Sequence, residues 1–264
     1  MIQIWKRSNK MKKILVIIVA LLIVFSSIFA FVLYDSSNNA INRYQCETID
    51  LYSNKLDDSF DEITILFFTD IMYGSYYQKD DLAKFQDYLK DFHYDIVIYG
   101  GNIFDKYYSA VSDDINILVD FFNQLDPQLG KFAIFSSYDL INDSRKVLAS
   151  KVYSDSNFIM IQDNKVLNNS NVPIYFTNVA DSHPQFTIAI ASDYQSGKQF
   201  SLTADYVLTG SAFNKQYQLF NDDEYHFGFN ENIYVSQSIG LTGKDYRLLN
   251  YPTITLITLH KESD

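Results

Sequence analysis

Oxygen-bearing side chains follow the ends of several apolar runs in this chain. Asp70 comes just after residues 63–68, an apolar and β-branched run typical of a strand buried on both faces. Asn102, Asp139 and Asp193 follow later runs. The carboxyl ends of strands in open α/β sheets are where ligands bind, and oxygen donors suit hard cations such as Mg²⁺ or Ca²⁺. The alternative is that Asp70 caps a turn and that these groups hydrogen-bond one another.

Histidines are absent from these strand ends. The four in the chain are His93, His183, His226 and His260. The single cysteine, Cys46, excludes a disulfide within the chain. A pair of Mn, Fe or Zn ions needs imidazole or thiolate ligands. We therefore expect no such metal pair and no bound cofactor. The alternative is a single Mg²⁺ or Ca²⁺ ion, for which the candidate ligands are Asp70, Asn102 and Asp193.

Apolar periodicity predicts the elements that would position these groups. Three strands alternate with three amphipathic helices, which implies parallel strands with right-handed crossovers. In chain order, these predicted elements are 63–68, 82–92, 95–99, 115–125, 131–135 and 143–150. From residue 158 onward strands follow one another, which predicts a mostly antiparallel or mixed second sheet. Those strands are 159–161, 172–176, 186–191, 206–208, 233–235 and 254–259.

The N-terminal region predicts a membrane segment. Residues 14–34 are an uncharged run of 21 residues, which as a helix would span roughly 30 Å, one bilayer core. Five basic and no acidic residues lie in the first 34, so the positive-inside rule places residues 1–13 in the cytoplasm and the rest outside. We expect a single-pass cell-membrane protein, and a cleaved signal peptide is the alternative. Residues 35–61 are polar and predict a stalk with an edge strand near 46–51.

The charge outside the apolar segment excludes one class of partner. The chain has a formal net charge of −11, and the part beyond residue 34 carries 16 basic and 32 acidic residues, a net charge of −16. A surface of this sign repels phosphate backbones, so we exclude nucleic acid. The expected partners are the membrane, through residues 14–34, and an envelope protein or a phospholipid.

The spacing of the strand ends and the C-terminal residues carry a family resemblance. The tail contains Tyr234-Val235-Ser236, Ile239-Gly240, Arg247 and the strand at 254–259. Residues 62–259 resemble the calcineurin-like metallophosphoesterase family, especially its membrane-anchored bacterial branch. The resemblance implies an α/β fold, a four-layer α/β/β/α sandwich over residues 62–264. It also implies motifs D-x-H, G-D, G-N-H-D/E, a lone histidine and G-H-x-H, which hold two metals and a catalytic histidine. Such a metal pair activates water and neutralises phosphate.

The first metal motifs of that family are degenerate in this chain. Asp70 keeps the aspartate of the first motif, but Met72 stands where its histidine belongs. Asn102 replaces the bridging carboxylate of the second motif with a neutral amide. In the third motif, Ser137 replaces the asparagine ligand and Tyr138 the catalytic histidine. An unperturbed tyrosine, with a pKa near 10, is a poor acid–base group at neutral pH.

The remaining motif positions show the same loss. The third motif ends with Asp139, and the lone histidine aligns with Asp193. Ser211 and Phe213 stand where the last motif has its two histidines. We expect these motif positions to line a relic pocket, with none of them catalytic.

Two functions are consistent with this pattern. The first is a membrane-anchored extracytoplasmic protein that has lost catalysis and acts as a binding or scaffold module at the cell envelope. The alternative is a phosphoesterase with a rebuilt site, in which one hard cation acts on lipid or envelope phosphates. We favour the first because the metal-ligating residues are replaced while the strand framework persists.

Overall fold

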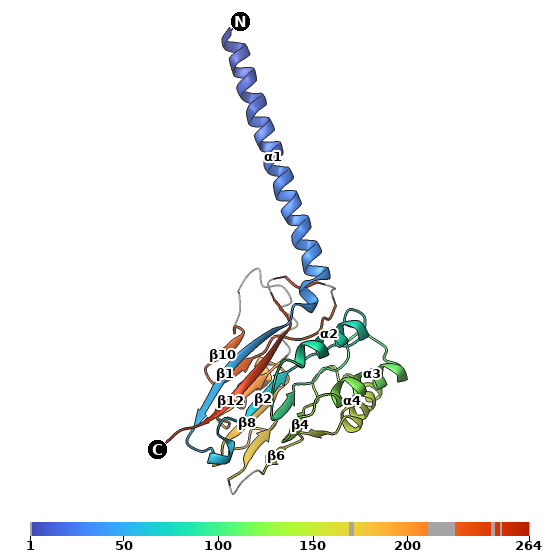
Figure 1. The fold of residues 1–264 in the computed structure, drawn as a ribbon, viewed down its shortest axis with the longest axis vertical. Helices are drawn as coiled ribbons and strands as arrows, with labels where there is room; N and C mark the ends of the chain where they lie inside the picture. Colours follow the sequence, from blue (N-terminus) through green and yellow to red (C-terminus); the bar gives the residue numbers. More distant parts are fainter. Residues whose placement is uncertain (1, 169–171, 211–224, 244–245, 249, 264) are drawn as a thin grey trace.

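The computed structural model describes residues 2–168, 172–210, 225–243, 246–248 and 250–263, with the backbone alone for residues 2–10. This part of the chain forms two six-stranded sheets below a long N-terminal helix (Figure 1). The first sheet has the spatial order β1 (Gln45–Ser53), β12 (Thr253–Lys261), β2 (Thr64–Phe68), β3 (Ile96–Tyr99), β4 (Gly130–Ala133), β5 (Phe158–Met160). The second has the order β10 (Gly228–Asn230), β11 (Ile233–Val235), β9 (Tyr206–Thr209), β8 (Thr187–Ala191), β7 (Ile174–Thr177), β6 (Asn164–Leu167).

The strand pairing confirms the parallel half and corrects the other half. Strands β2 to β5 are parallel, as the alternation of strands and helices predicted. Two strands that we predicted to belong to the second sheet are part of the first sheet instead. β5 pairs with β4, and β12 lies between β1 and β2, antiparallel to β2. Periodicity identifies a strand but not its neighbour, because pairing is decided by distant parts of the chain.

The second sheet is mixed, as predicted, with a parallel centre. β7, β8, β9 and β11 run parallel to one another, while β6 and β10 pair antiparallel at the two edges. Neither β6 nor β10 was predicted from the sequence, because both are short and carry polar residues among few apolar ones. The edge strand predicted near residues 46–51 is β1.

Side-chain alternation along β2 explains how the layers pack. Ile65 and Phe67 point into the core between the two sheets, whereas Leu66 and Phe68 point to the opposite face. That face is covered by α2 (Lys79–Leu89), α3 (Ser112–Asn123) and α4 (Asp143–Asp155). The short helix α5 (Tyr194–Lys198) packs on the outer face of the second sheet. The α/β/β/α sandwich is therefore confirmed.

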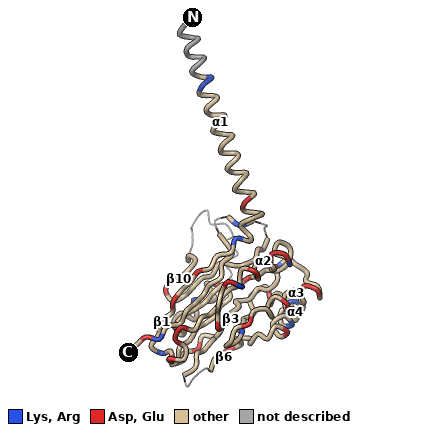
Figure 2. Tube along the Cα trace, viewed as in Figure 1, with Lys and Arg blue, Asp and Glu red and all other residues tan. Residues whose placement is uncertain are grey.

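Helix α1 (Ile2–Asn38) carries the apolar segment and stands clear of the sheets (Figure 1). Its most apolar 18-residue window has a mean hydropathy of 3.2 and none of it is buried. Figure 2 shows basic residues near one end of this uncharged stretch and an acidic residue near the other. By length and composition the helix could cross a membrane, and a signal sequence has the same properties.

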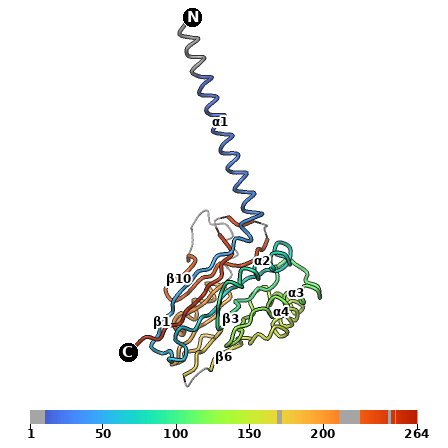
Figure 3. The backbone as a smooth tube through the Cα atoms, viewed as in Figure 1, coloured from blue at the N-terminus to red at the C-terminus, as the bar shows by residue number. Residues whose placement is uncertain are grey.

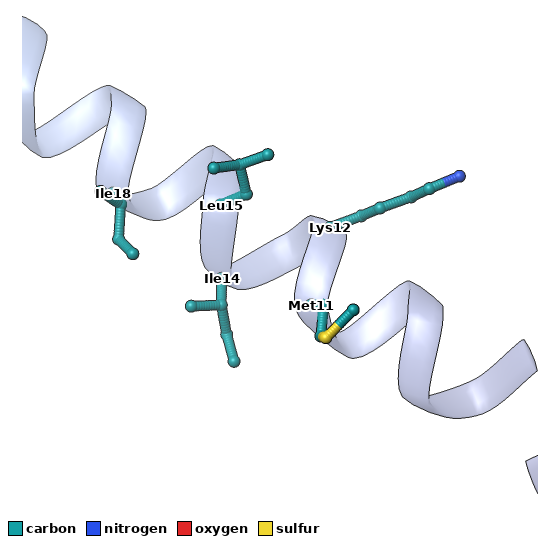
Figure 4. A pocket seen from close by; sticks show the side chains of 5 residues that line it. All are labelled: Met11, Lys12, Ile14, Leu15 and Ile18. Atoms are coloured by element: carbon teal, nitrogen blue, oxygen red, sulfur yellow. The ribbon is translucent and has the colours of Figure 1, made fainter. Parts of the chain in front are cut away.

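A shallow hollow on α1 is lined by Met11, Lys12, Ile14, Leu15 and Ile18 (Figure 4). All five side chains come from one exposed helix, and no second element among the described residues lines the hollow. It is therefore part of the apolar helix surface rather than an enclosed ligand site.

The end of α1 is tied to the domain with little free chain between them. The Ser36 carbonyl oxygen accepts a hydrogen bond of 2.9 Å from the Arg247 amide. Asn42, at the end of the short helix η1 (Ala40–Asn42), donates to the Asp81 carboxylate at 2.9 Å. The Ser36 and Ala40 side chains are buried. The polar residues after the apolar segment therefore pack against the domain, and the domain begins directly where the apolar run ends.

Candidate functional site

The loops after β2 and β3 are paired through their backbones. The Asp70 amide donates to the Gly101 carbonyl oxygen at 2.9 Å, and the Met72 amide donates to the Asn102 carbonyl oxygen at 3.1 Å. Both loops leave parallel neighbouring strands at the same sheet edge, so their polar side chains meet, as predicted. This pairing brings Asp70 and Asn102 together at the centre of the candidate site.

Asp70 is fully buried and accepts hydrogen bonds on both carboxylate oxygens. Asn102 Nδ2 donates to Oδ1 at 2.7 Å, and Ser238 Oγ donates to Oδ2 at 3.0 Å. The Asn102 amide is oriented unambiguously, because its Oδ1 accepts from the Tyr138 backbone N–H at 2.9 Å. The hydrogen-bearing nitrogen of Asn102 therefore faces Asp70.

Asp139 holds the loops after β3 and β4 together. Its carboxylate accepts backbone N–H bonds from Asn102 at 2.9 Å, Ile103 at 2.9 Å and Ser136 at 3.1 Å. Complete burial raises the pKa of Asp139, although these bonds and the Tyr153 hydroxyl act in the opposite direction. The group acts as a structural acceptor for the loops, with its oxygens directed at backbone donors.

Three of the predicted pocket residues have different surroundings. Met72 is fully buried, so it adds apolar bulk beneath the loops. Tyr138 is half-buried, and burial raises the pKa of its phenol, which makes it a still weaker acid–base group at neutral pH. Ser137 is exposed. Ser211 and Phe213 lie outside the described residues.

Left-handed backbone marks the same loops. Asp70 has a φ of 58°, Met72 of 51° and Asn102 of 58°, although none of them is glycine. Such conformations cost roughly 1–3 kcal/mol each and persist where the surrounding structure enforces them. Here the backbone pairing of the two loops and the hydrogen bonds to the buried carboxylates enforce these conformations. The loops after β2 and β3 therefore have the strained backbone that often occurs at functional sites.

Asp193 follows β8 and caps α5. Its carboxylate accepts from the Ser196 amide at 2.9 Å, from the Ser196 hydroxyl at 2.8 Å and from the Ser192 hydroxyl at 2.8 Å. Partial burial raises the pKa of Asp193, but these hydrogen bonds outweigh it and the net pKa is lowered. The carboxylate thus has a local structural role at the start of a helix.

Replacing Asp193 by alanine should cost about 1 kcal/mol of unfolding free energy through loss of the cap. Asp193→Asn should be nearly neutral at pH 7, because asparagine caps as well. Because the pKa of Asp193 is lowered in the folded state, the ionised carboxylate stabilises the fold relative to the protonated acid. This contribution is complete above the ordinary pKa of aspartate and is lost as pH falls through the lowered pKa, whereas asparagine does not titrate. Thermal unfolding of both variants from pH 7 to pH 3 measures this. A constant difference between wild type and Asp193→Asn over that range would contradict the assignment.

The sequence did not assign a site role to the segment between β11 and β12. Besides Ser238, it contributes Gly240, whose amide donates to the Asp70 carbonyl oxygen at 2.8 Å. It also contributes Arg247, which is 1% exposed and donates to the Ile239 carbonyl oxygen at 3.0 Å and to Asn250 Oδ1 at 2.9 Å. Burial lowers the pKa of Arg247 to about 10. The only advance signal was the resemblance of this tail to the family.

The donors around Asp70 do not fit a metal pair. A cation bound at Oδ1 would face the N–H hydrogens of Asn102 Nδ2, a nitrogen 2.7 Å from Oδ1, where the implied motif has a bridging carboxylate. Within the residues that the structure describes, the contacts of all four histidines are with groups other than Asp70: His260 contacts Asp50 and Glu62, His93 lies near Asp95, His183 lies near Asp181, and the His226 amide donates to Asn230. Among the described residues, the arrangement can orient loops and accept hydrogen bonds, but it does not assemble the ligands for two ions.

The comparisons with known proteins concern the fold alone. No protein-family model matches the sequence, and no curated protein matches it. Among solved structures, the calcineurin-like phosphoesterase YfkN from Bacillus subtilis is 12% identical, with a TM-score of 0.40 over 67% of this chain and 81% of that one. The Pseudomonas putida nuclease MPE is 14% identical, with a TM-score of 0.32 over 47% of this chain. The match spans 59% of the nuclease, less than two thirds of its length. Both matches are structural similarities at low identity.

Proposed function

We propose that this protein is a membrane-anchored, extracytoplasmic binding or scaffold module on a metallophosphoesterase-like fold, without a catalytic metal centre. The observation that carries the proposal is the hydrogen bonding of Asp70. Both of its oxygens accept from side-chain donors, one of them the amide that replaces a ligand carboxylate. A carboxylate used in this way stabilises the loops instead of holding a Lewis acid.

The other polar groups of the site support the same function. Asp139 accepts three backbone N–H bonds, and Asp193 caps a helix. Each carboxylate therefore has a structural use that needs no ion. Loops that are rigid and held at a sheet edge are a common basis for binding, because little ordering entropy is lost when a partner arrives.

The junction supports anchoring. Helix α1 is continuous from the apolar segment into residues that pack on the domain, through Ser36 and Arg247. Together with the basic N-terminus, this favours an uncleaved anchor with the domain outside the cell. A membrane neighbour, either an envelope protein or a phospholipid, is the partner that this placement makes available.

The rebuilt-site alternative uses one Mg²⁺ or Ca²⁺ ion on Asp70, Asn102 and Asp193. We rank it second, because binding an ion there requires Asp70 to give up Asn102 and Ser238, and Asp193 to give up its capping bonds. Each of these bonds is worth about 1 kcal/mol, or more where a charge is involved.

An activity assay tests the proposal. The full-length protein, purified in detergent with added Mn²⁺ or Mg²⁺, should hydrolyse aryl phosphate monoesters and diesters no faster than the metal in buffer alone. The reason is that nothing at Asp70 generates metal-bound hydroxide. Asp70→Asn is the matched control and should give the same background rate. Turnover above background that disappears in Asp70→Asn would overturn the proposal.

A further inference from the structure

The end of the domain away from α1 carries a second group of metal-ligating side chains. The C-terminus lies at this end, as Figure 3 shows. His260 is in β12, while Asp61 and Glu62 lie just before β2. One ligand atom from each of these three residues lies within 4.8 Å of the others. Glu62 precedes β2 (Thr64–Phe68) and Asp70 follows it, eight positions later, so the group and the candidate site lie at opposite ends of this strand.

The His260 ring is held in one orientation. It stacks on Tyr52, its neighbour across β1 and β12, with ring centres 4.8 Å apart and planes at 21°. Nε2 lies 3.1 Å from the Asp50 carboxylate. We assign the ring N–H to Nε2 because its carboxylate contact is the shorter of the two, and this tautomer leaves the lone pair on the other nitrogen. In His260 that other nitrogen is Nδ1, and it faces Glu62.

The spacing between Nδ1 and Glu62 suits a shared ion. The separation from Oε1 is 3.3 Å, slightly beyond the usual range of an N–H···O hydrogen bond. Two ligands of a tetrahedral zinc ion, each bound at about 2.0–2.1 Å, lie about 3.3 Å apart. The observed distance therefore matches the edge of a zinc coordination tetrahedron.

The charges around the group also favour a cation. Asp61 accepts a backbone bond from Lys261 on Oδ1 at 2.9 Å. The Lys261 ammonium points elsewhere and donates to the Asn54 carbonyl oxygen at 2.7 Å. Among the ion pairs of the described residues, His260 is the one basic partner of Glu62, and Asp61 has none. Two adjacent carboxylates beside one imidazole thus leave a net negative charge.

We propose that Asp61, Glu62 and Nδ1 of His260 form a divalent transition-metal site, with zinc as the fitting ion and Asp50 as the positioning carboxylate. Two carboxylates and one imidazole are three protein ligands, which leaves a fourth position for water. The ion would join the start of β2 to the last strand of the chain. The proposal does not depend on the proposed function, because the group is distant from Asp70.

Zinc binding by the full-length protein in detergent tests the site. After chelator treatment and equilibration with Zn²⁺, elemental analysis should find one zinc per chain, and His260→Gln should remove it. Glu62→Gln, an exposed change that cannot disturb the core, should also weaken binding. Asp50→Asn should raise the zinc Kd about 10- to 100-fold, as the loss of a supporting carboxylate does elsewhere.

Two controls make the result decisive. His93→Gln changes an exposed histidine that lies 3.9 Å from Asp95, and it should leave zinc content unchanged. Asp70→Asn should also retain the zinc. Equal zinc content in wild type, His260→Gln and Glu62→Gln would overturn the proposal, as would zinc that is lost in Asp70→Asn and kept in His260→Gln.

Discussion

Replacing Gly240 by alanine is expected to separate the β11–β12 segment from the Asp70 loop. A Cβ atom at this position would lie 1.8 Å from the Ile71 carbonyl oxygen and 2.6 Å from its carbon. Both are backbone atoms, so neither can rotate away, and the Gly240–Asp70 hydrogen bond would be lost. We expect a loss of about 3 kcal/mol or more of unfolding free energy, roughly 6–12 °C in Tm. Thermal unfolding followed by circular dichroism in detergent measures it.

Gly243→Ala is the matched control in the same segment. Gly243 has a φ of 72°, and within the described part of the chain no atom lies within 4 Å of an added Cβ. Its replacement therefore introduces backbone strain without a clash, at a cost of about 1 kcal/mol. If the two variants lost equal stability, close packing against Ile71 would not be the reason for glycine at position 240.

Arg247→Ala should give the second large effect. The guanidinium is buried and donates to carbonyl oxygens of residues 238, 239 and 240 and to Asn250. Its removal leaves these acceptors without a donor and opens a cavity beside Asp70. Each buried acceptor that loses its donor costs about 1–3 kcal/mol, and the cavity adds to this cost, so we expect a loss of about 3–5 kcal/mol of unfolding free energy. The same unfolding experiment measures it, and the fold near Asp70 should loosen first.

Arg43→Ala provides the comparison for Arg247. Arg43 pairs with Asp35 and lies over the Tyr251 ring, but it is exposed. Surface pairs of this kind contribute little, so its Tm should stay close to that of wild type. A similar drop in both variants would mean that the loss of positive charge, rather than the loss of the buried hydrogen bonds, sets the stability.

The central part of the site was predictable because it depends on local patterns. The apolar run before Asp70 and the next strand before Asn102 indicate parallel neighbours, and parallel neighbours end at one edge. The bond between their side chains follows from that geometry. The absence of histidine from the predicted strand ends was also readable, since it concerns residue types alone.

The rest of the site depends on contacts across the chain. Ser238 reaches Asp70 from a position 168 residues away, and no periodicity indicates such a meeting. Ser137 is exposed, and its position in a motif does not fix the direction of its side chain. The insertion of β12 beside β2 is likewise a product of tertiary packing.

The tight junction between α1 and the domain has a mechanical consequence. Ser36, Asn42 and Arg43 all form hydrogen bonds or an ion pair, so no flexible linker separates the helix from the domain. In the anchored form, a helix that tilts to match a thinner bilayer would swing the whole domain with it. Membrane thickness would then set the angle at which the domain contacts neighbouring proteins. Those proteins must lie no farther from the lipid surface than the domain itself extends.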